Sequence, residues 1–228
     1  MKWIDDFVSL IYPRLCCTCA RHLLKEEKFL CFICLNDLPY TGFIEMPQNP
    51  VQDIFYSRVK VNRAASYLEF EKGNKTQLIL HELKYRSNPE IGNYFGEIIG
   101  SEMKDSSLYN DIDAIIPVPI HKSKLESRGY NQSEYIADGI SKATNIQVID
   151  REVIRVKNSV SQTKKGRYER WENVQSIFRL KPDRIKSAKH LLLVDDVVTT
   201  GATLESLSKC LNSYKKFEIS ILTLARSG

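Results

Sequence analysis

The fold prediction depends mainly on residues 191–204, which read LLLVDDVVTTGATL. Four aliphatic residues in a row are typical of a strand that is buried on both faces of a parallel sheet. Two acids and a turn of small hydroxyl residues with glycine follow, and then residues 202–211 have the apolar spacing of a helix. This order predicts one strand–turn–helix unit of an α/β domain, with its polar side chains at the carboxyl end of the strand.

The polar turn of this unit carries the groups that a sugar phosphate needs. Asp195 and Asp196 are hydrogen-bond acceptors when ionised, so they suit two adjacent sugar hydroxyls. The N–H groups at the helix start suit a phosphate, because they are unpaired and the helix dipole favours an anion there. Gly201 allows the backbone to approach the ligand closely. We therefore expect the acids to bind ribose hydroxyls and the turn to bind a 5-phosphate through Thr199, Thr200, Gly201, Ala202 and Thr203.

The rest of the chain alternates expected strands and helices in the same way. The expected strands are residues 64–70, 114–116, 146–149, 176–180, 190–194 and 217–224, and the expected helices are residues 76–85, 91–104, 133–143 and 202–211. The alternation predicts an α/β domain over residues 63–228, with a mostly parallel sheet and flanking helices. Residues 41–62 have few periodic signals and are interpreted as a linker. Residues 1–12 have the apolar spacing of a short amphipathic helix.

Five of the six cysteines lie between residues 16 and 34. Cys16 and Cys19 form one C-x-x-C pair, and Cys31 and Cys34 form a second, which is the spacing of a tetrahedral zinc site with four thiolate ligands. Cys17 competes with Cys16 for the first position, and His22 is a further alternative ligand. Because metals hold together small modules that have little core, residues 1–40 are interpreted as a helix and a zinc-binding module.

Composition and charge exclude several classes of protein. With 43% hydrophobic and 27% charged residues among 228, the chain is not a disordered protein. Its apolar runs are far shorter than the roughly 20 residues of a membrane span. The acidic start at Asp5 and Asp6, with no long apolar core after it, is unlike a signal peptide, so we expect a cytoplasmic protein.

The positive charge is concentrated in one segment. The net charge is +5, but residues 151–190 alone contain twelve Lys or Arg and four Asp or Glu, a local charge of +8. Such a segment suits the phosphates of a small molecule or of nucleic acid.

Residues 191–204 resemble the phosphoribosyl-pyrophosphate loop of type I phosphoribosyltransferases, in which hydrophobic residues precede two acids and a Thr-Gly-rich turn. The stretches IPVPIHK at 116–122, RGYNQ at 128–132 and LKY at 83–85 are similar to the ComF/GntX family of competence-associated phosphoribosyltransferase-like proteins. That family also carries an N-terminal zinc-ribbon-like module, so the resemblance covers most of the chain except residues 41–62. It implies a type I phosphoribosyltransferase-like fold and displacement at the ribose anomeric carbon, with Mg²⁺ balancing the charge of the leaving pyrophosphate and with Asp195 and Asp196 as the catalytic acids.

Two further loops of the expected site follow from the resemblance. The loop after Ile116 is expected to hold the pyrophosphate, through Pro119, His121, Lys122, Arg128 and Asn131. The basic stretch 159–173 lies where these enzymes have a flexible loop that closes over the substrate, and its expected contributors are Gln162, Lys164, Arg167 and Arg170. The same stretch interleaves Tyr168 and Trp171 with basic residues, which also suits single-stranded nucleic acid through charge and stacking.

Two functions are therefore open. The first is a protein of the DNA-uptake type that binds phosphoribosyl pyrophosphate and acts as a transferase on an unknown acceptor. The second is a protein that handles single-stranded DNA and uses the same fold as a binding module without transferase activity. Single-stranded DNA and competence proteins are the expected macromolecular partners.

Overall fold

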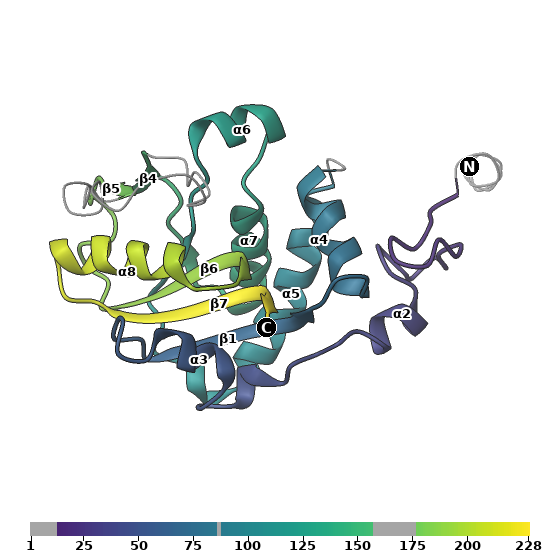
Figure 1. The fold of residues 1–228 in the computed structure, drawn as a ribbon, viewed down its shortest axis with the longest axis horizontal. Coiled ribbons are helices and arrows are strands. Elements are labelled where there is room, and N and C mark those ends of the chain that lie inside the picture. The colour runs from purple at the N-terminus through teal and green to yellow at the C-terminus, as the bar shows by residue number, and fades with distance from the viewer. Residues whose placement is uncertain (1–12, 86–87, 157–176) are drawn as a thin grey trace, which may run out of the picture.

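The computed structural model describes residues 13–85, 88–156 and 177–228. Within these ranges its centre is a five-stranded sheet in the order β1-β7-β6-β2-β3 (Figure 1). The strands are β1 (Arg63–Phe70), β2 (Ala114–Pro117), β3 (Gln147–Val148), β6 (His190–Val198) and β7 (Glu218–Ser227). Every neighbouring pair in this sheet is parallel, and β4 (Val153–Arg155) and β5 (Phe178–Leu180) form a separate antiparallel pair. The predicted α/β class with a parallel sheet is confirmed.

Helices cover both faces of the sheet. One face packs against α4 (Lys75–Tyr85), α5 (Glu90–Asp105) and α7 (Gln132–Thr144). The other packs against α3 (Pro50–Phe55), α8 (Ala202–Tyr214) and the β4–β5 pair. Successive side chains of a strand point to opposite faces, so within β6 Leu192 and Val194 join the first layer and Leu191 and Leu193 join the second. This double cover explains why β6 contains an uninterrupted aliphatic run.

Several short helices complete the described chain. They are α2 (Phe32–Asn36), η1 (Phe43–Glu45), η2 (Ser107–Tyr109) and α6 (Lys122–Arg128). Both η1 and α3 lie in the stretch 41–62, where the sequence pattern predicts a linker. Asn49 caps α3 by accepting a hydrogen bond from the Val51 N–H at 2.9 Å, and Val51 and Phe55 are fully buried. This stretch therefore contributes side chains to the core. The helix expected over residues 1–12 lies outside the described residues.

Glycines allow α5 and α7 to pack closely. A Cβ atom added to Gly139 would lie 2.3 Å from the carbonyl oxygen of Asn93, and one added to Gly96 would lie 2.3 Å from that of Ile136. Both distances are far below van der Waals contact, and the neighbouring atoms are backbone atoms of the facing helix. A side chain at either position therefore requires the two helices to separate.

We expect Gly139→Ala to lower the free energy of unfolding by about 1–3 kcal/mol, the usual effect of overpacking a tight contact. This expected range is net of the higher helix propensity of alanine, which contributes about 1 kcal/mol in the opposite direction. Urea denaturation measures the change. Ser141→Ala in the same helix is the matched control and should stay within about 0.5 kcal/mol of wild type. A Gly139→Ala protein as stable as wild type would show that the helix contact tolerates a methyl group.

Candidate functional site

The acid pair lies within the sheet's longest described ladder. The sequence pattern predicts a strand that ends at Val194, but β6 continues to Val198. Strand β2 pairs with β6 only as far as Val194, whereas β7 continues alongside, with Asp195 opposite Thr223 and Val198 opposite Arg226. Asp195 and Asp196 therefore have one paired neighbour, β7, and an open side beyond the end of β2.

Asp195 is held by two hydrogen bonds. The Ser133 hydroxyl at the start of α7 donates to Asp195 Oδ1 at 2.9 Å, and the backbone N–H of Asp196 donates to the same oxygen at 2.9 Å. Burial, and then repulsion from Asp196, raise the pKa of Asp195 to about 7. The ionised Asp195 carboxylate is therefore an unfavourable buried charge. Binding of a proton or a ligand by this carboxylate relieves that cost.

Asp196 is paired with a cation from a distant helix. Lys84 Nζ, near the end of α4, lies 2.9 Å from Asp196 Oδ2, and both side chains are largely buried. The sequence gives Lys84 only through its place in the LKY stretch, and Ser133 carries no signal of its own. Lys84 and Ser133 are far from Asp195 in the sequence, and the packing of α4 and α7 on the sheet brings them to the site.

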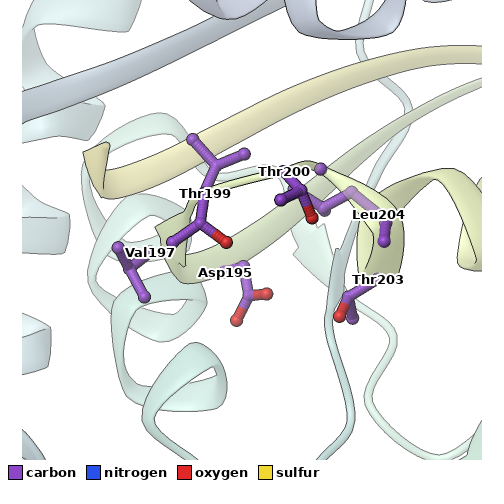
Figure 2. A pocket seen from close by; sticks show the side chains of 9 residues that line it. Asp195, Val197, Thr199, Thr200, Thr203 and Leu204 are labelled. Atoms are coloured by element: carbon purple, nitrogen blue, oxygen red, sulfur yellow. The ribbon is translucent and has the colours of Figure 1, made fainter. Parts of the chain in front are cut away.

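The turn after β6 forms a small pocket together with Asp195. Its lining is Asp195 and residues 197–204, and Figure 2 shows the side chains of Asp195, Thr199, Thr200 and Thr203 around it. Helix α8 begins at Ala202, and no side chain caps its first turn. The structure therefore brings the predicted phosphate-binding residues next to Asp195, while Asp196 lies outside this lining.

The turn after β6 packs against α3 and the residues that follow α3. Gly201 has φ +71°, a left-handed conformation that favours glycine. A Cβ atom there would lie 2.7 Å from Ile54 Cγ2. Arg58 donates to the carbonyl oxygen of Thr200 at 2.6 Å and forms an ion pair with Glu205 of α8. The backbone conformation of the turn and the close packing against Ile54 thus both require glycine at position 201, whether or not a ligand binds.

The predicted pyrophosphate loop surrounds α6. His121 Nδ1 accepts a hydrogen bond from the Ser123 N–H at 3.2 Å and so caps α6. Lys122 Nζ lies 3.7 Å from Oε1 of Glu126, one helical turn later. The guanidinium of Arg128 lies 5.6 Å from the centre of the Tyr85 ring.

Asn131, at the end of this loop, is buried. It accepts from the Ser133 N–H at 3.3 Å and donates to the carbonyl oxygen of Val118 at 3.1 Å. It thereby links the loop to the start of α7. The pyrophosphate roles of Pro119, His121, Lys122, Arg128 and Asn131 stay predictions.

The predicted flexible-loop residues Gln162, Lys164, Arg167 and Arg170 lie outside the described residues. Strands β4 and β5 bring the two flanks of that stretch together, since the Val156 N–H donates to the Ile177 carbonyl at 2.9 Å. On β4, burial lowers the pKa of the half-buried Arg155 guanidinium, and the nearby charge of Asp195 opposes this shift. Arg155 is therefore a cation close enough to interact with the charge of Asp195, and the sequence analysis does not single it out.

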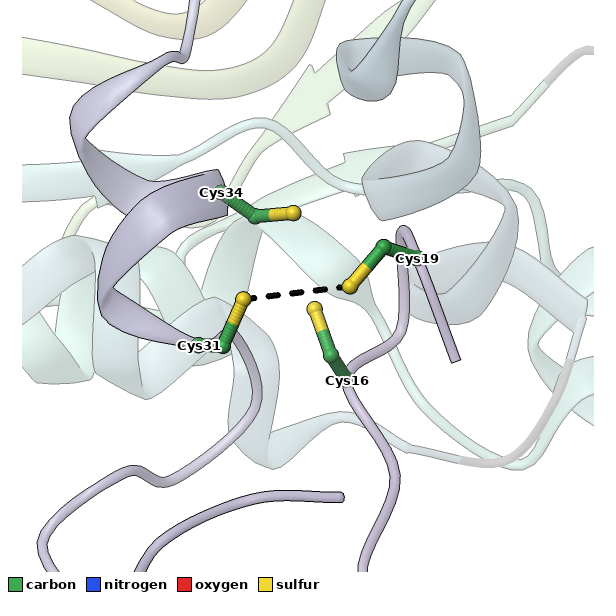
Figure 3. A group of neighbouring side chains, drawn as sticks. All are labelled: Cys16, Cys19, Cys31 and Cys34. Carbon is green, nitrogen blue, oxygen red and sulfur yellow. Dashed lines mark hydrogen bonds between the residues drawn. The ribbon is translucent and has the colours of Figure 1, made fainter. Parts of the chain in front are cut away.

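The four predicted metal ligands converge in the N-terminal part of the chain (Figure 3). The Sγ atoms of Cys16, Cys19, Cys31 and Cys34 all lie within 4.8 Å of one another. Tetrahedral zinc with Zn–S bonds of about 2.3 Å separates its sulfurs by about 3.8 Å, and Cys19 Sγ and Cys31 Sγ are 3.8 Å apart. We call residues 13–38 the cysteine module, and its four thiols fit a zinc ion.

Cys17 and His22 do not belong to this group of four. Burial opposes the ionisation of Cys16, yet hydrogen bonds from Thr18 and from backbone groups lower the pKa of Cys16 to about 6. Burial and repulsion from Cys16 raise the pKa of Cys17 to about 12. The position of its Sγ atom within the group of four therefore favours Cys16 over Cys17 as the ligand.

Comparisons with known proteins identify relatives along most of the chain. It is 32% identical over 222 residues to competence protein ComFC of Bacillus subtilis, which covers 91% of this chain and 88% of that protein. It is 28% identical over 154 residues to competence protein F of Haemophilus influenzae, covering 66% of this chain and 67% of that protein. The DNA utilization protein YhgH of Escherichia coli O157:H7 is 27% identical over 137 residues, 59% of this chain and 60% of that protein. No family model matches the chain.

Among the described residues, no helix has both the length and the apolar character that crossing a membrane requires.

Proposed function

The chain belongs to the ComF family of competence and DNA-utilization proteins, and we propose that it binds phosphoribosyl pyrophosphate and transfers the phosphoribosyl group to an acceptor during the uptake or use of DNA. One observation carries the proposal. A carboxylate and a helix N-terminus border the same pocket, formed by Asp195 and residues 197–204. We place this activity in the cytoplasm, where phosphoribosyl pyrophosphate would be available.

The turn after β6 supports binding of the 5-phosphate. The first N–H groups of a helix lack partners within the helix, and α8 starts at this pocket without a side-chain cap. Thr199, Thr200 and Thr203 add hydroxyl donors from the pocket lining. A phosphate at this position would also gain from the dipole of α8.

The acids support binding of the ribose. Asp195 and Asp196 provide carboxylate oxygens, which accept from hydroxyls and are the ligand type that Mg²⁺ prefers. Mg²⁺ bound there with the pyrophosphate would offset phosphate charge. In the transfer, the nucleophile of the acceptor forms a bond to the anomeric carbon while the bond from that carbon to the pyrophosphate oxygen breaks. Asp195 would stabilise the positive charge that develops on the sugar.

A second candidate is binding of single-stranded DNA. The local charge of +8 over residues 151–190 favours it, as do relatives whose names refer to competence and DNA utilization. Such binding would be independent of base sequence, because basic residues contact phosphates and aromatic rings stack on any base.

Calorimetric titrations of the full chain separate the two candidates. We expect phosphoribosyl pyrophosphate with Mg²⁺ to bind as one equivalent per chain, and ribose 5-phosphate to compete with it. A mixed-base DNA oligonucleotide of about 20 nucleotides is titrated in parallel. If three or more phosphates are contacted, its affinity falls about tenfold or more between about 50 and 200 mM salt. A chain that binds neither the sugar phosphate nor its competitor contradicts the proposal, and salt-dependent binding of DNA alone would support the second candidate.

A further inference from the structure

A second group of potential metal ligands lies at the other end of β6 from Asp195. It consists of Asp111, in the segment before β2, His190, the first residue of β6, and Glu218, the first residue of β7. His190 and Glu218 are register partners in the sheet. One ligand atom from each of the three residues lies within 4.8 Å of the other two. The group therefore joins three segments at the amino-terminal edge of the parallel strands.

His190 is the unusual member of this group. Its side chain is only 3% exposed, and its Nε2 atom lies 2.9 Å from the Ser220 hydroxyl. Its Nδ1 atom is buried and makes no hydrogen bond within the described part of the chain. Asp111 Oδ2 lies only 3.1 Å from Nδ1, and Glu218 Oε2 lies 3.9 Å from it. Buried polar atoms without a partner are rare in proteins and point to a missing ion or water.

These distances suit a shared metal ion. Zinc bonds to imidazole nitrogen and carboxylate oxygen are about 2.0–2.2 Å long, so two ligands at a tetrahedral angle lie roughly 3.4 Å apart. The two distances from Nδ1, 3.1 Å to Asp111 and 3.9 Å to Glu218, lie on either side of this value. When a metal occupies the lone-pair axis of a ring nitrogen, a second ligand must lie beside that axis. This agrees with a carboxylate that is close to Nδ1 without accepting a hydrogen bond from it.

Neighbouring groups orient the three side chains. If Nε2–H donates to Ser220, the tautomer that results leaves a lone pair on Nδ1 that is free to bind a metal ion. Asn62 Nδ2 donates to Glu218 Oε2 at 2.7 Å. Asp113 Oδ2 accepts from the His190 N–H at 2.8 Å and so fixes the start of β6. Partners of this kind are the usual outer shell of metal-binding histidines and carboxylates.

We propose that Asp111, His190 and Glu218 bind one divalent transition-metal ion of the zinc class. One imidazole and two carboxylates form a ligand set that such ions accept, with a fourth position open to water. The carboxylates are 61% and 63% exposed, so an ion can enter from solvent. The ion would connect the segment before β2 to the starts of β6 and β7. This site is separate from the cysteine module and does not depend on the proposed transferase function.

The test uses the full chain with its cysteine module already saturated with zinc. Further Zn²⁺ is titrated by calorimetry in a buffer that does not bind metal. We expect one additional equivalent in the wild type and its loss in the double variant Asp111→Asn, Glu218→Gln. Both substitutions keep the side-chain shape at exposed positions, and circular dichroism verifies the fold. Asp183→Asn is the matched control, since Asp183 is an exposed acid elsewhere on the surface, and it should retain the equivalent.

A further variant tests the outer shell. Asn62→Ala should keep the stoichiometry and weaken zinc binding by about tenfold or more, because it frees the Glu218 carboxylate. The proposal is overturned if the wild type takes up no additional zinc. It is also overturned if the double variant binds the additional zinc as tightly as the wild type, since the ion would then be bound elsewhere.

Discussion

Removing zinc from the full chain with a strong chelator is expected to unfold the cysteine module while the parallel sheet persists. The module has little core of its own, and a bound structural zinc contributes an apparent binding free energy of about 10–16 kcal/mol in small domains. Limited proteolysis should detect the change as new cleavage within residues 13–38. Far-ultraviolet circular dichroism should lose little signal, because α2 is the only α-helix in the described part of that module. Loss of the whole chain's secondary structure, or no new cleavage, would contradict this expectation.

The contacts of the module indicate a second effect. Cys16, Cys31 and Cys34 are buried in the same cluster as side chains of α4 and α5. The Phe29 ring packs edge-to-face on Tyr94 of α5, with ring centres 5.6 Å apart, and Lys75 of α4 lies 2.6 Å from Asp37. Unfolding the module would expose this apolar surface of the larger domain. We therefore expect the metal-free chain to melt at a lower temperature and to aggregate more readily.

The neighbouring cysteines provide a matched pair of variants. Cys16→Ser should reduce the tightly bound zinc by about one ion per chain, because a hydroxyl is a poor substitute for thiolate in a four-sulfur site. Cys17→Ser should retain that ion, since Cys17 lies outside the group of four. Elemental analysis after dialysis measures both. Zinc lost from Cys17→Ser and retained by Cys16→Ser would assign the ligand to Cys17.

The elements that sequence predicts well are those whose apolar residues follow a clear period. The expected strands and helices at 64–70, 76–85, 91–104 and 133–143 agree with β1, α4, α5 and α7 within one or two residues at each end. The missed helices lack that signal for different reasons. Helix α6 has no buried residue, so it has no apolar face to detect. Helix α3 is six residues long and buries only Val51 and Phe55, which is too short to establish a period.

Sequence predicts the residues of the candidate site that lie near one another along the chain, and it misses those that come from distant segments. Asp195 and residues 199–203 lie within nine consecutive residues, so a strand followed by a turn and a helix start is enough to place them together. Ser133, Lys84 and Arg58 contact the site from α7, from α4 and from the stretch after α3. Their positions follow from how the helices pack on the sheet, and no spacing within the sequence encodes that packing.

Replacing both acids of the site with Asn is expected to weaken binding of phosphoribosyl pyrophosphate by tenfold to a hundredfold or more. Each lost charge-assisted hydrogen bond contributes roughly 1.5–3 kcal/mol, and about 1.4 kcal/mol corresponds to tenfold in affinity. The fold should survive, because an Asn oxygen at position 195 can still accept from Ser133 and from the backbone N–H of residue 196. An Asn oxygen at position 196 can likewise still accept from Lys84. Calorimetry with the sugar phosphate and Mg²⁺ measures the loss. Ser133→Ala is the control, since it removes a partner of Asp195 but no carboxylate.

The pH dependence separates a ligand-binding acid from a structural one. The folded-state pKa of Asp195 is raised to about 7, above the value of about 3.9 in an unfolded chain. The folded state therefore binds more protons, and this group makes the protein less stable as pH rises from about 4 to 7. Asp195→Asn removes that penalty, so at pH 8 the variant should melt at the same or a higher temperature than wild type while binding the ligand less tightly.

Affinity should have the opposite dependence on pH. If the ribose hydroxyls and Mg²⁺ bind the ionised carboxylate, wild-type affinity rises as pH increases from about 6 to 8, and Asp195→Asn lacks this rise. Comparing the two proteins at each pH cancels the titration of the ligand's own phosphates. Under this expectation, the ionised Asp195 carboxylate destabilises the free protein but strengthens ligand binding. Its role is then to bind the ligand and not to stabilise the fold. Equal affinity of wild type and the double variant at every pH would show that the acid pair does not bind the ribose, and the proposed function would fail with it.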